Sequence, residues 1–247
     1  MKKMKIVFLG SSHGVPEPHR KCSSAMIEIG ENRYFIDMGT QSIEELITRN
    51  IPVESVKAVF VTHMHGDHTN GLISFIDLCS WRFKDADPTI CLPGNIEESR
   101  KAIEAWLICN GNVLRPFKFR CVNEGLVFDD GTLRVTAFRT MHIDYSYAFL
   151  IEAEGKRVLF SGDLCHSGPE NDFPLSVLSE PLDLAICESA HFEATDYVPL
   201  LKGNKNLKKL CFNHYSELYL KSVLDAKKIF SQDIEVTIAT DGLEIRL

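Results

Sequence analysis

Four side chains of the kinds that bind metal ions lie within six consecutive positions of this sequence. They are His63, His65, Asp67 and His68, which follow the apolar run at 58–61. Residues two apart in an extended chain point the same way, so His63 and His65 can bind one ion from the same side. Gly66 allows a sharp backbone turn, after which Asp67 and His68 can face a second ion nearby. Imidazole and carboxylate groups at this density match the ligand set of borderline metals such as zinc, so the segment indicates a metal centre rather than a solvated turn.

The segment Thr62-His63-Met64-His65-Gly66-Asp67-His68-Thr69-Asn70-Gly71-Leu72 resembles the signature of the metallo-β-lactamase-fold hydrolases. Within that group the chain is similar to the ribonuclease Z-like phosphodiesterase branch, and the resemblance extends over nearly the whole sequence. It implies an α/β fold, a four-layer αββα sandwich in which each half is a sheet with outer helices and the metal site lies at the sandwich edge. It also implies a single hydrolase domain over residues 1–247.

The family pattern implies three further ligands, and each has a candidate after an apolar run. The implied first set is His63, His65 and His142, the second is Asp67, His68 and His214, and Asp163 bridges the two. Taken alone, His142 or His214 would be interpreted as a structural histidine. The motif at 63–68 favours metal binding for both instead. The small residues Ser161 and Gly162 would let the bridging carboxylate approach two cations without backbone crowding.

Two divalent ions about 3.5–4 Å apart can share a hydroxide at neutral pH and stabilise charge on a reacting group, so hydrolysis is the expected reaction. The resemblance implies that Asp67 also orients or deprotonates the attacking water. His191 would act as a second catalytic residue that protonates the leaving oxygen, with a surface role as the alternative. Glu188 would orient a ligand histidine. Zinc is the expected metal, with manganese or iron as alternatives.

Several other residues have weaker indications. Arg20 follows a stretch similar to the branch's opening loop and would hold a phosphate. Asp37 ends a predicted strand, either as an acid that supports the metal site or as the cap of a simple turn. His13, His19 and His166 have no assigned role. A basic cluster at Lys202, Lys205, Lys208 and Lys209 is expected to be a solvated face rather than a nucleic-acid site.

The elements that must position these residues can be read from hydrophobic periodicity. Apolar runs rich in Val, Ile and Phe predict strands at 6–9, 25–29, 34–36, 58–61, 133–138, 158–160, 182–186 and 236–239. Helical spacing occurs at 96–109 and 219–230. Helices between strands in both halves predict layered α/β architecture, and many of the strands end in polar residues where loops can carry chemistry.

Composition limits the class of protein. The 247 residues are 45% hydrophobic and 25% charged, which is typical of a globular chain, and no linker or repeat divides them. A formal net charge of -7 argues against broad attraction to nucleic acid or to a membrane surface. The eight cysteines include no C-x-x-C pair and are expected to be reduced thiols. The apolar run at 6–9 is too short for a signal peptide, so a cytoplasmic location is expected.

The sequence therefore predicts a dinuclear phosphodiesterase. Members of the branch that process tRNA carry a long arm, commonly between the positions of His142 and Asp163, and here only 21 positions separate these residues. A small or single-stranded phosphodiester, such as a cyclic nucleotide or a short RNA end, is the expected substrate. Hydrolysis of a carboxylic ester, thioester or lactone is the enzymatic alternative, and a non-catalytic metal-binding or sensing protein is the other. A homodimer is expected from the branch.

Overall fold

The computed structural model describes residues 3–113, 115–165 and 171–247. His166, which has no role assigned from the sequence, lies outside these residues.

Two seven-stranded mixed sheets form the centre of the described part of the chain. The first has the order β14-β1-β2-β3-β4-β5-β6, and the second has the order β13-β12-β11-β10-β9-β8-β7. The strands of the first sheet are β1 (Met4–Gly10), β2 (Ser24–Ile29), β3 (Asn32–Ile36), β4 (Val56–Phe60), β5 (Thr89–Pro93), β6 (Lys118–Val122) and β14 (Glu244–Arg246). Those of the second are β7 (Gly125–Asp129), β8 (Arg134–Thr140), β9 (Ser146–Ala153), β10 (Lys156–Phe160), β11 (Leu184–Ser189), β12 (Lys209–Tyr215) and β13 (Glu235–Ile238).

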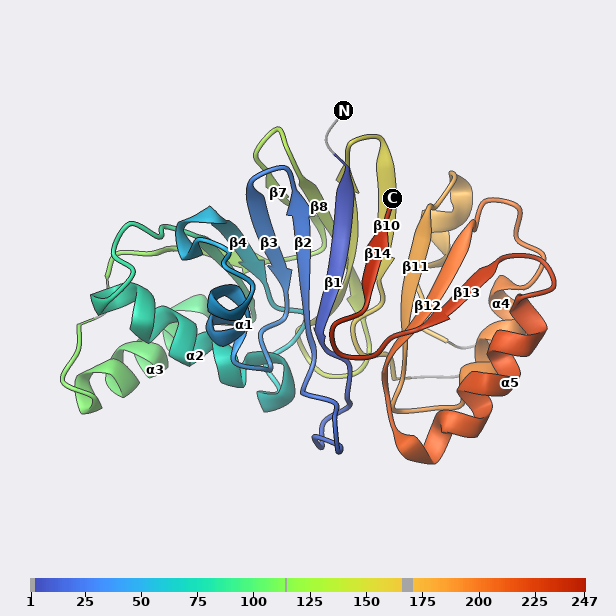
Figure 1. Ribbon diagram of the computed structural model, residues 1–247, viewed down its shortest axis with the longest axis horizontal. Coiled ribbons are helices and arrows are strands. Elements are labelled where there is room, and N and C mark those ends of the chain that lie inside the picture. The colour runs from blue at the N-terminus through green and yellow to red at the C-terminus, as the bar shows by residue number, and fades with distance from the viewer. Residues whose placement is uncertain (1–2, 114, 166–170) are drawn as a thin grey trace.

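Helices cover the outer face of each sheet, which completes the four layers (Figure 1). The helices beside the first sheet are α1 (Ser42–Thr48), α2 (Gly66–Trp81) and α3 (Ile96–Cys109), and those beside the second are α4 (Val198–Leu201) and α5 (Leu220–Phe230). The structure thus has the αββα arrangement expected from the sequence. None of the described helices is long and apolar enough to cross a membrane.

The two sheets pack face to face through a core of large apolar side chains. Phe60 of β4 lies edge-on to Phe128 of β7, with 5.3 Å between ring centroids, and 6.2 Å from the ring of Phe149 of β9. These three rings are at most 7% exposed. Because each buried aromatic side chain removes a large apolar area from water, this layer supplies much of the free energy that holds the two halves together.

The helices use regular apolar spacing to pack on the sheets. On α5 the buried residues Val223, Ala226 and Phe230 recur at intervals of three and four and face the second sheet. The predicted helix at 96–109 has the bounds observed for α3, where the side chain of Asn95 accepts hydrogen bonds from the first-turn amides. Helix α2 was not predicted from the sequence, and Gly66 begins this helix rather than a sharp turn.

Parallel pairing brings the functional strand ends to one edge. Strands β3, β4 and β5 are mutually parallel in the first sheet, and β10, β11 and β12 are parallel in the second. The residues that follow β4 and β10 and the end of β12 carry six of the seven ligand candidates from the sequence. The seventh, His142, follows β8, which runs in the same direction as β10 because both are antiparallel to β9. This edge of the sandwich is therefore the place where a site can form.

Candidate metal centre

Seven ligand-type residues from both sheets converge at this edge. They form sets of three residues whose ligand atoms lie within 4.8 Å of one another. Three of these sets are His63, His65 and His142; His63, His68 and Asp163; and Asp67, His68 and His214. These are the seven residues expected from the sequence, and the groupings join the two halves of the molecule. A fourth set joins His142, Asp163 and His191.

The first group is built around His65, which lies between β4 and α2. Its Nδ1 atom is 3.0 Å from Nε2 of His63 and 3.2 Å from Nε2 of His142, in the turn between β8 and β9. Nitrogen atoms that each bind a zinc ion at 2.0–2.1 Å in tetrahedral geometry would be about 3.4 Å apart. The observed separations are close to that value, so the three imidazoles fit one ion.

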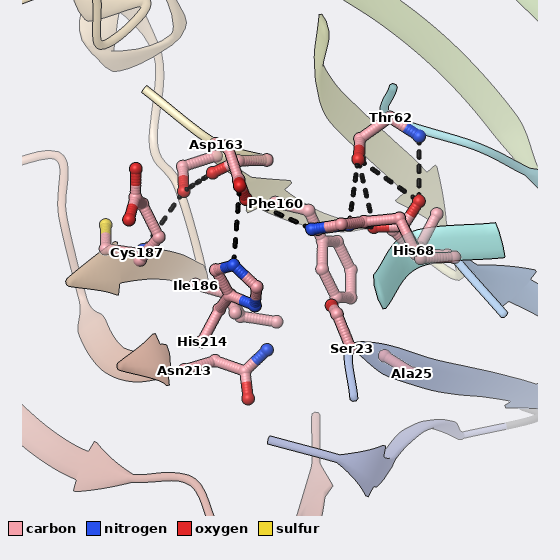
Figure 2. Close-up of a pocket in the computed structure, with 15 residues that line it drawn as sticks. Ser23, Ala25, Thr62, His68, Phe160, Asp163, Ile186, Cys187, Asn213 and His214 are labelled. Atoms are coloured by element: carbon pink, nitrogen blue, oxygen red, sulfur yellow. Dashed lines mark hydrogen bonds and ion pairs between the residues drawn. The ribbon is translucent and has the colours of Figure 1, made fainter. Parts of the chain in front are cut away.

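The second group lies at the start of α2 and on β12. Nε2 of His68 is 3.2 Å from Oδ2 of Asp67, and Nε2 of His214 is 3.8 Å from the same oxygen. Asp163 lies between the groups, because its Oδ2 atom is 3.3 Å from Nε2 of His214 and 3.6 Å from Nε2 of His63. Figure 2 shows His68, Asp163 and His214 pointing toward one another across the pocket.

Among the buried polar atoms here that have no hydrogen-bond partner, two face each other. They are Nε2 of His68 and Oδ1 of Asp163, which lie 3.5 Å apart in side chains that are 1% and 4% exposed. Leaving such groups unpaired away from water costs free energy. A cation between the imidazole and the carboxylate would satisfy both atoms, so the donor set and its surroundings fit metal ions.

Charge and burial also suit ligand binding. Burial and the neighbouring His68 lower the pKa of His63 to about 2, which keeps this imidazole neutral. Burial opposes ionisation of Asp67, but the nearby charge of His68 outweighs it and lowers the pKa of Asp67 to about 2. Burial likewise opposes ionisation of Asp163, whose pKa is nevertheless held well below its usual range by His214 and His68. Neutral imidazole beside ionised carboxylate is the state in which these groups bind metals, and His63, Asp67 and Asp163 are in that state. Burial lowers the pKa of His68, but the carboxylates of Asp163 and Asp37 outweigh it and raise that pKa well above its usual value, so this imidazole must lose its proton when a metal binds.

Asp37 is positioned to support the site, which agrees with the first of its two predicted roles, an acid beside the metal site rather than the cap of a simple turn. It is 3% exposed, and its Oδ2 atom is 2.8 Å from Nδ1 of His68. Its Oδ1 atom accepts hydrogen bonds from the backbone and hydroxyl of Thr62, at 2.8 Å and 3.1 Å. The carboxylate therefore fixes the His68 ring with Nε2 toward the centre. Sequence reasoning missed Thr62, whose hydroxyl also lies 3.1 Å from Nδ1 of His63.

His191 stands at the rim of the centre. Its side chain is 33% exposed, and its Nδ1 atom is 2.8 Å from Oε1 of Glu188, while Nε2 is 3.8 Å from Oδ2 of Asp163. Burial lowers the pKa of His191, but the Glu188 carboxylate outweighs it and raises that pKa to about 9. Glu188 also accepts the backbone N–H of Leu164 at 2.7 Å. The histidine that Glu188 orients is therefore His191, and the expectation that Glu188 orients one of the seven ligand candidates is wrong.

Arg20 does not lie free to hold a phosphate. Its side chain is 7% exposed, forms an ion pair with Glu17 and stacks 3.9 Å above the ring of Tyr215. It also donates to the backbone oxygen of Ser11 at 3.3 Å. These contacts use the guanidinium to fasten the opening loop to β12. His13 joins the same cluster through Glu17, at 3.1 Å, and His19 is exposed.

Two smaller expectations can be compared with the structure. Gly162 has φ +58°, and an added Cβ would lie 2.6 Å from the backbone oxygen of Tyr147. The backbone thus needs glycine here because of Tyr147 on β9. In the basic cluster, Lys208 pairs with Asp183 at 3.0 Å and Lys209 pairs with Glu235 at 2.8 Å. Half of the cluster is neutralised by neighbouring carboxylates, in keeping with the solvated-face interpretation.

The chain is similar to a described protein family and to curated proteins. A family described as "Anti-Pycsar protein Apyc1" matches residues 4–172. Ribonuclease Z of Limosilactobacillus fermentum (strain NBRC 3956 / LMG 18251) is 31% identical over 153 residues, which cover 60% of this chain and 49% of the relative. The chain spans about half the length of the curated relatives that it matches.

Solved structures share the fold over nearly the whole chain. The metallo-beta-lactamase fold protein YhfI from Bacillus subtilis superposes with a TM-score of 0.78 at 21% identity, covering 99% of this chain and 100% of that protein. The short form of human tRNase Z superposes with a TM-score of 0.73 at 21% identity, covering 98% of each chain. The αββα fold expected from the sequence is confirmed, as is the resemblance to ribonuclease Z-like proteins.

Proposed function

The chain belongs to the family of the anti-Pycsar protein Apyc1, with a ribonuclease Z-like metallo-β-lactamase fold, and on this premise we propose that it is a metal-dependent phosphodiesterase. The observation that carries the proposal is the pair of three-residue ligand groups joined by Asp163. A site that only bound one structural metal would need four ligands around one point. Two adjacent groups that share a carboxylate are typical of sites that hydrolyse substrates.

In this proposal one divalent ion would be held by His63, His65 and His142, and the other by Asp67, His68 and His214. Asp163, which lies near both groups, would complete the site. When bound, the ions would supply an activated water and positive charge at the reacting phosphate. Zinc is the metal proposed first, because imidazole predominates among the donors, with manganese or iron as alternatives. Residues 1–247 act as one hydrolase domain, since the ligands come from both halves of the chain.

The chain's own acids and bases complete the chemistry. Asp67 lies at the edge of the second group and orients the attacking water or takes its proton. His191 stands at the rim with Glu188 on its Nδ1 atom, which leaves Nε2 free to donate a proton to the leaving oxygen. The pairing of His191 with a buried carboxylate fixes the ring orientation that such a transfer needs.

The proposed substrate is a small or single-stranded phosphodiester. The chain from His142 to Asp163 is occupied by a short turn and strands β9 and β10, so no arm protrudes between these two ligands. The acidic net charge of -7 also disfavours a large folded RNA. A homodimer and a cytoplasmic location stay predictions from the sequence.

The test is hydrolysis of bis(p-nitrophenyl) phosphate by protein loaded separately with zinc and with manganese. We expect turnover that Asp163→Ala reduces by at least a hundredfold. Asp183→Ala is the matched control, because Asp183 is also a buried carboxylate beside β10 but lies at the opposite end of that strand, where it accepts the N–H of Arg157. Metal-loaded protein without turnover would contradict the proposal. Esters, thioesters and lactones would then be assayed, and inactivity on these as well would favour a non-catalytic protein.

A further inference from the structure

One carboxylate outside the seven ligand-type residues contacts both loops that carry His142 and Asp163. Oδ2 of Asp172 accepts the backbone N–H of Met141 at 2.6 Å, and Oδ1 accepts that of Cys165 at 3.2 Å. Met141 directly precedes His142, and Cys165 follows Asp163 by two positions. A single side chain therefore links the backbones of two loops from different strands.

These loops would not come together through the sheet alone. His142 follows β8 and Asp163 follows β10, and β9 lies between these strands. Strands separated by one neighbour are about 9–10 Å apart. Yet Nε2 of His142 lies only 3.7 Å from Oδ2 of Asp163. The backbones themselves also approach, because Oδ2 of Asp172 lies 2.6 Å from the amide nitrogen of Met141 and 3.3 Å from that of Cys165, and two atoms so close to one oxygen are nearer to each other than strands separated by one neighbour. Asp172 is placed where it can hold that arrangement.

The segment that carries Asp172 is itself anchored in the core. Phe173 is 4% exposed and lies 6.0 Å, between ring centroids, from Tyr197. The hydroxyl of Tyr197 donates to the backbone oxygen of Glu188 at 3.1 Å, and Glu188 accepts the N–H of Leu164. Asp172 thus projects from a point fixed to the outer core of the second sheet, and its carboxylate can act as a rigid link.

We infer that Asp172 is a positioning residue that holds the His142 and Asp163 loops at the separation needed for metal binding. The inference rests on the proposed function, because it assigns the two loops to one metal centre. Asp172 contacts the loops through backbone N–H groups and touches neither ligand side chain in these hydrogen bonds. Its effect is therefore on the alignment of the ligands rather than on the chemistry of the reaction.

The first measurement is metal retention against a competing chelator at equilibrium. Loss of a group that orients metal ligands typically lowers metal affinity by about 10–100-fold. We expect Asp172→Ala to release metal at least tenfold more readily than the wild type. Asp172→Asn, which keeps one oxygen acceptor, should recover part of that loss. Asp183→Ala, the control of the same residue type, should lower stability and leave metal retention unchanged.

The second measurement is hydrogen–deuterium exchange at the amides of Met141 and Cys165 in metal-free protein. Asp172→Ala should accelerate exchange at both amides, while Asp183→Ala should accelerate it at Arg157 and not at these two. Unchanged metal retention or unchanged exchange in Asp172→Ala would overturn the inference. Wild-type protein that binds no metal would contradict the proposed function separately, and the exchange rates would still decide whether Asp172 links the loops.

Discussion

At the scale of single residues, the centre depends on carboxylates that orient imidazoles. Asp37 contacts Nδ1 of His68 and Glu188 contacts Nδ1 of His191, each at 2.8 Å. In both pairs the carboxylate is buried and the imidazole is left with Nε2 toward the centre. Because the ring cannot rotate without breaking these contacts, the approach of each histidine is fixed before any ligand arrives. The two histidines differ in exposure, which favours ligation for His68 and proton transfer at the rim for His191.

The role of His191 can be tested through the leaving group. General acid catalysis contributes about 10²–10⁴-fold, and it matters most when the leaving oxygen is strongly basic. We expect His191→Gln to lower kcat by at least a hundredfold on a diester with an alkyl leaving group and by far less on bis(p-nitrophenyl) phosphate. His19→Gln, in an exposed histidine, serves as the control. Equal losses on the two substrates would show that His191 only supports the structure.

The residues closest in sequence were the easiest to predict. The motif formed by His63, His65, Asp67 and His68 spans six positions, so its spacing alone indicated metal binding. The structure brings these side chains together. Arg20 shows why the roles of other residues could not be predicted from the sequence. Its guanidinium pairs with Glu17 and stacks on Tyr215, nearly two hundred positions away, and the identity of such partners depends on the tertiary fold. The N–H groups that Asp172 accepts have no sequence signature at all.

At the scale of elements, helix α2 places Asp67 and His68 because a loop packs against its first turn. The N–H of Met38 donates to the backbone oxygen of His68 at 2.9 Å, and the N–H of Gly71 donates to that of Met38 at 2.7 Å. A Cβ at Gly71 would lie 1.7 Å from the backbone oxygen of Thr40. Glycine is therefore required in the helix for the close approach of this loop.

This close approach predicts an effect opposite to helix propensity. Alanine in place of glycine normally stabilises a helix interior by about 1 kcal/mol. We expect Gly71→Ala instead to lower the free energy of unfolding by about 1–3 kcal/mol, because overpacking forces the loop and α2 apart. Urea denaturation measures the change. Ser74→Ala in the same helix should be neutral or slightly stabilising, and a stabilised Gly71→Ala would contradict the packing argument.

The same glycine helps to explain why helix α2 could not be predicted from the sequence. The segment of α2 begins with Gly66 and contains Thr69, Asn70 and Gly71, residue types that weaken a helix, so tertiary contacts rather than propensity determine it. By contrast, α3 has a capping asparagine and was predicted with its observed bounds. The predicted strand at 158–160 lies within β10, where Val158, Leu159 and Phe160 are all buried.

Strand β10 also carries an acid-sensitive contact at the end remote from the centre. Burial raises the pKa of Asp183, but the backbone N–H of Arg157 and the ammonium of Lys208 outweigh it, so the folded-state pKa lies below the usual value. The resulting stabilisation is present above the unfolded-state pKa of about 3.9 and is lost as the pH falls through the folded-state value. We expect Asp183→Asn to be destabilising at pH 7, with the difference from wild type shrinking below pH 4 in urea denaturation. A constant difference would refute this linkage.

At the scale of the whole molecule, the site is a connection between the two halves of the sandwich. His63, His65, Asp67 and His68 follow the first sheet, whereas His142, Asp163 and His214 belong to the second. The aromatic core formed by Phe60, Phe128 and Phe149 joins the sheets through their apolar faces. The overall αββα arrangement could be predicted from the motif's resemblance, but not the pairing of these particular rings, which depends on the register of opposing sheets.

Because each proposed ion has ligands from both halves, metal binding should stabilise the fold as a whole. A ligand present at a hundred times its Kd stabilises the folded state by about 2.7 kcal/mol. For a chain of this size each kcal/mol raises Tm by about 2–4 °C. We expect zinc-loaded protein to melt several degrees above protein stripped with a chelator, as measured by calorimetry.

The Asp163→Ala variant separates this effect from general binding of metal to the surface. Asp163 is the one carboxylate within 4 Å of ligand nitrogens in both proposed groups among the described residues, at 3.3 Å from His214 and 3.6 Å from His63. Without it the two groups no longer share an oxygen, so the increase in Tm on adding zinc should fall by more than half. Removing Asp163 also leaves the neighbouring His68 and His214 without their carboxylate partner, so the metal-free variant is expected to be less stable than metal-free wild type, and the test compares the zinc-dependent shift within each protein. An equal zinc-dependent shift in both proteins would mean that the stabilising metal lies elsewhere.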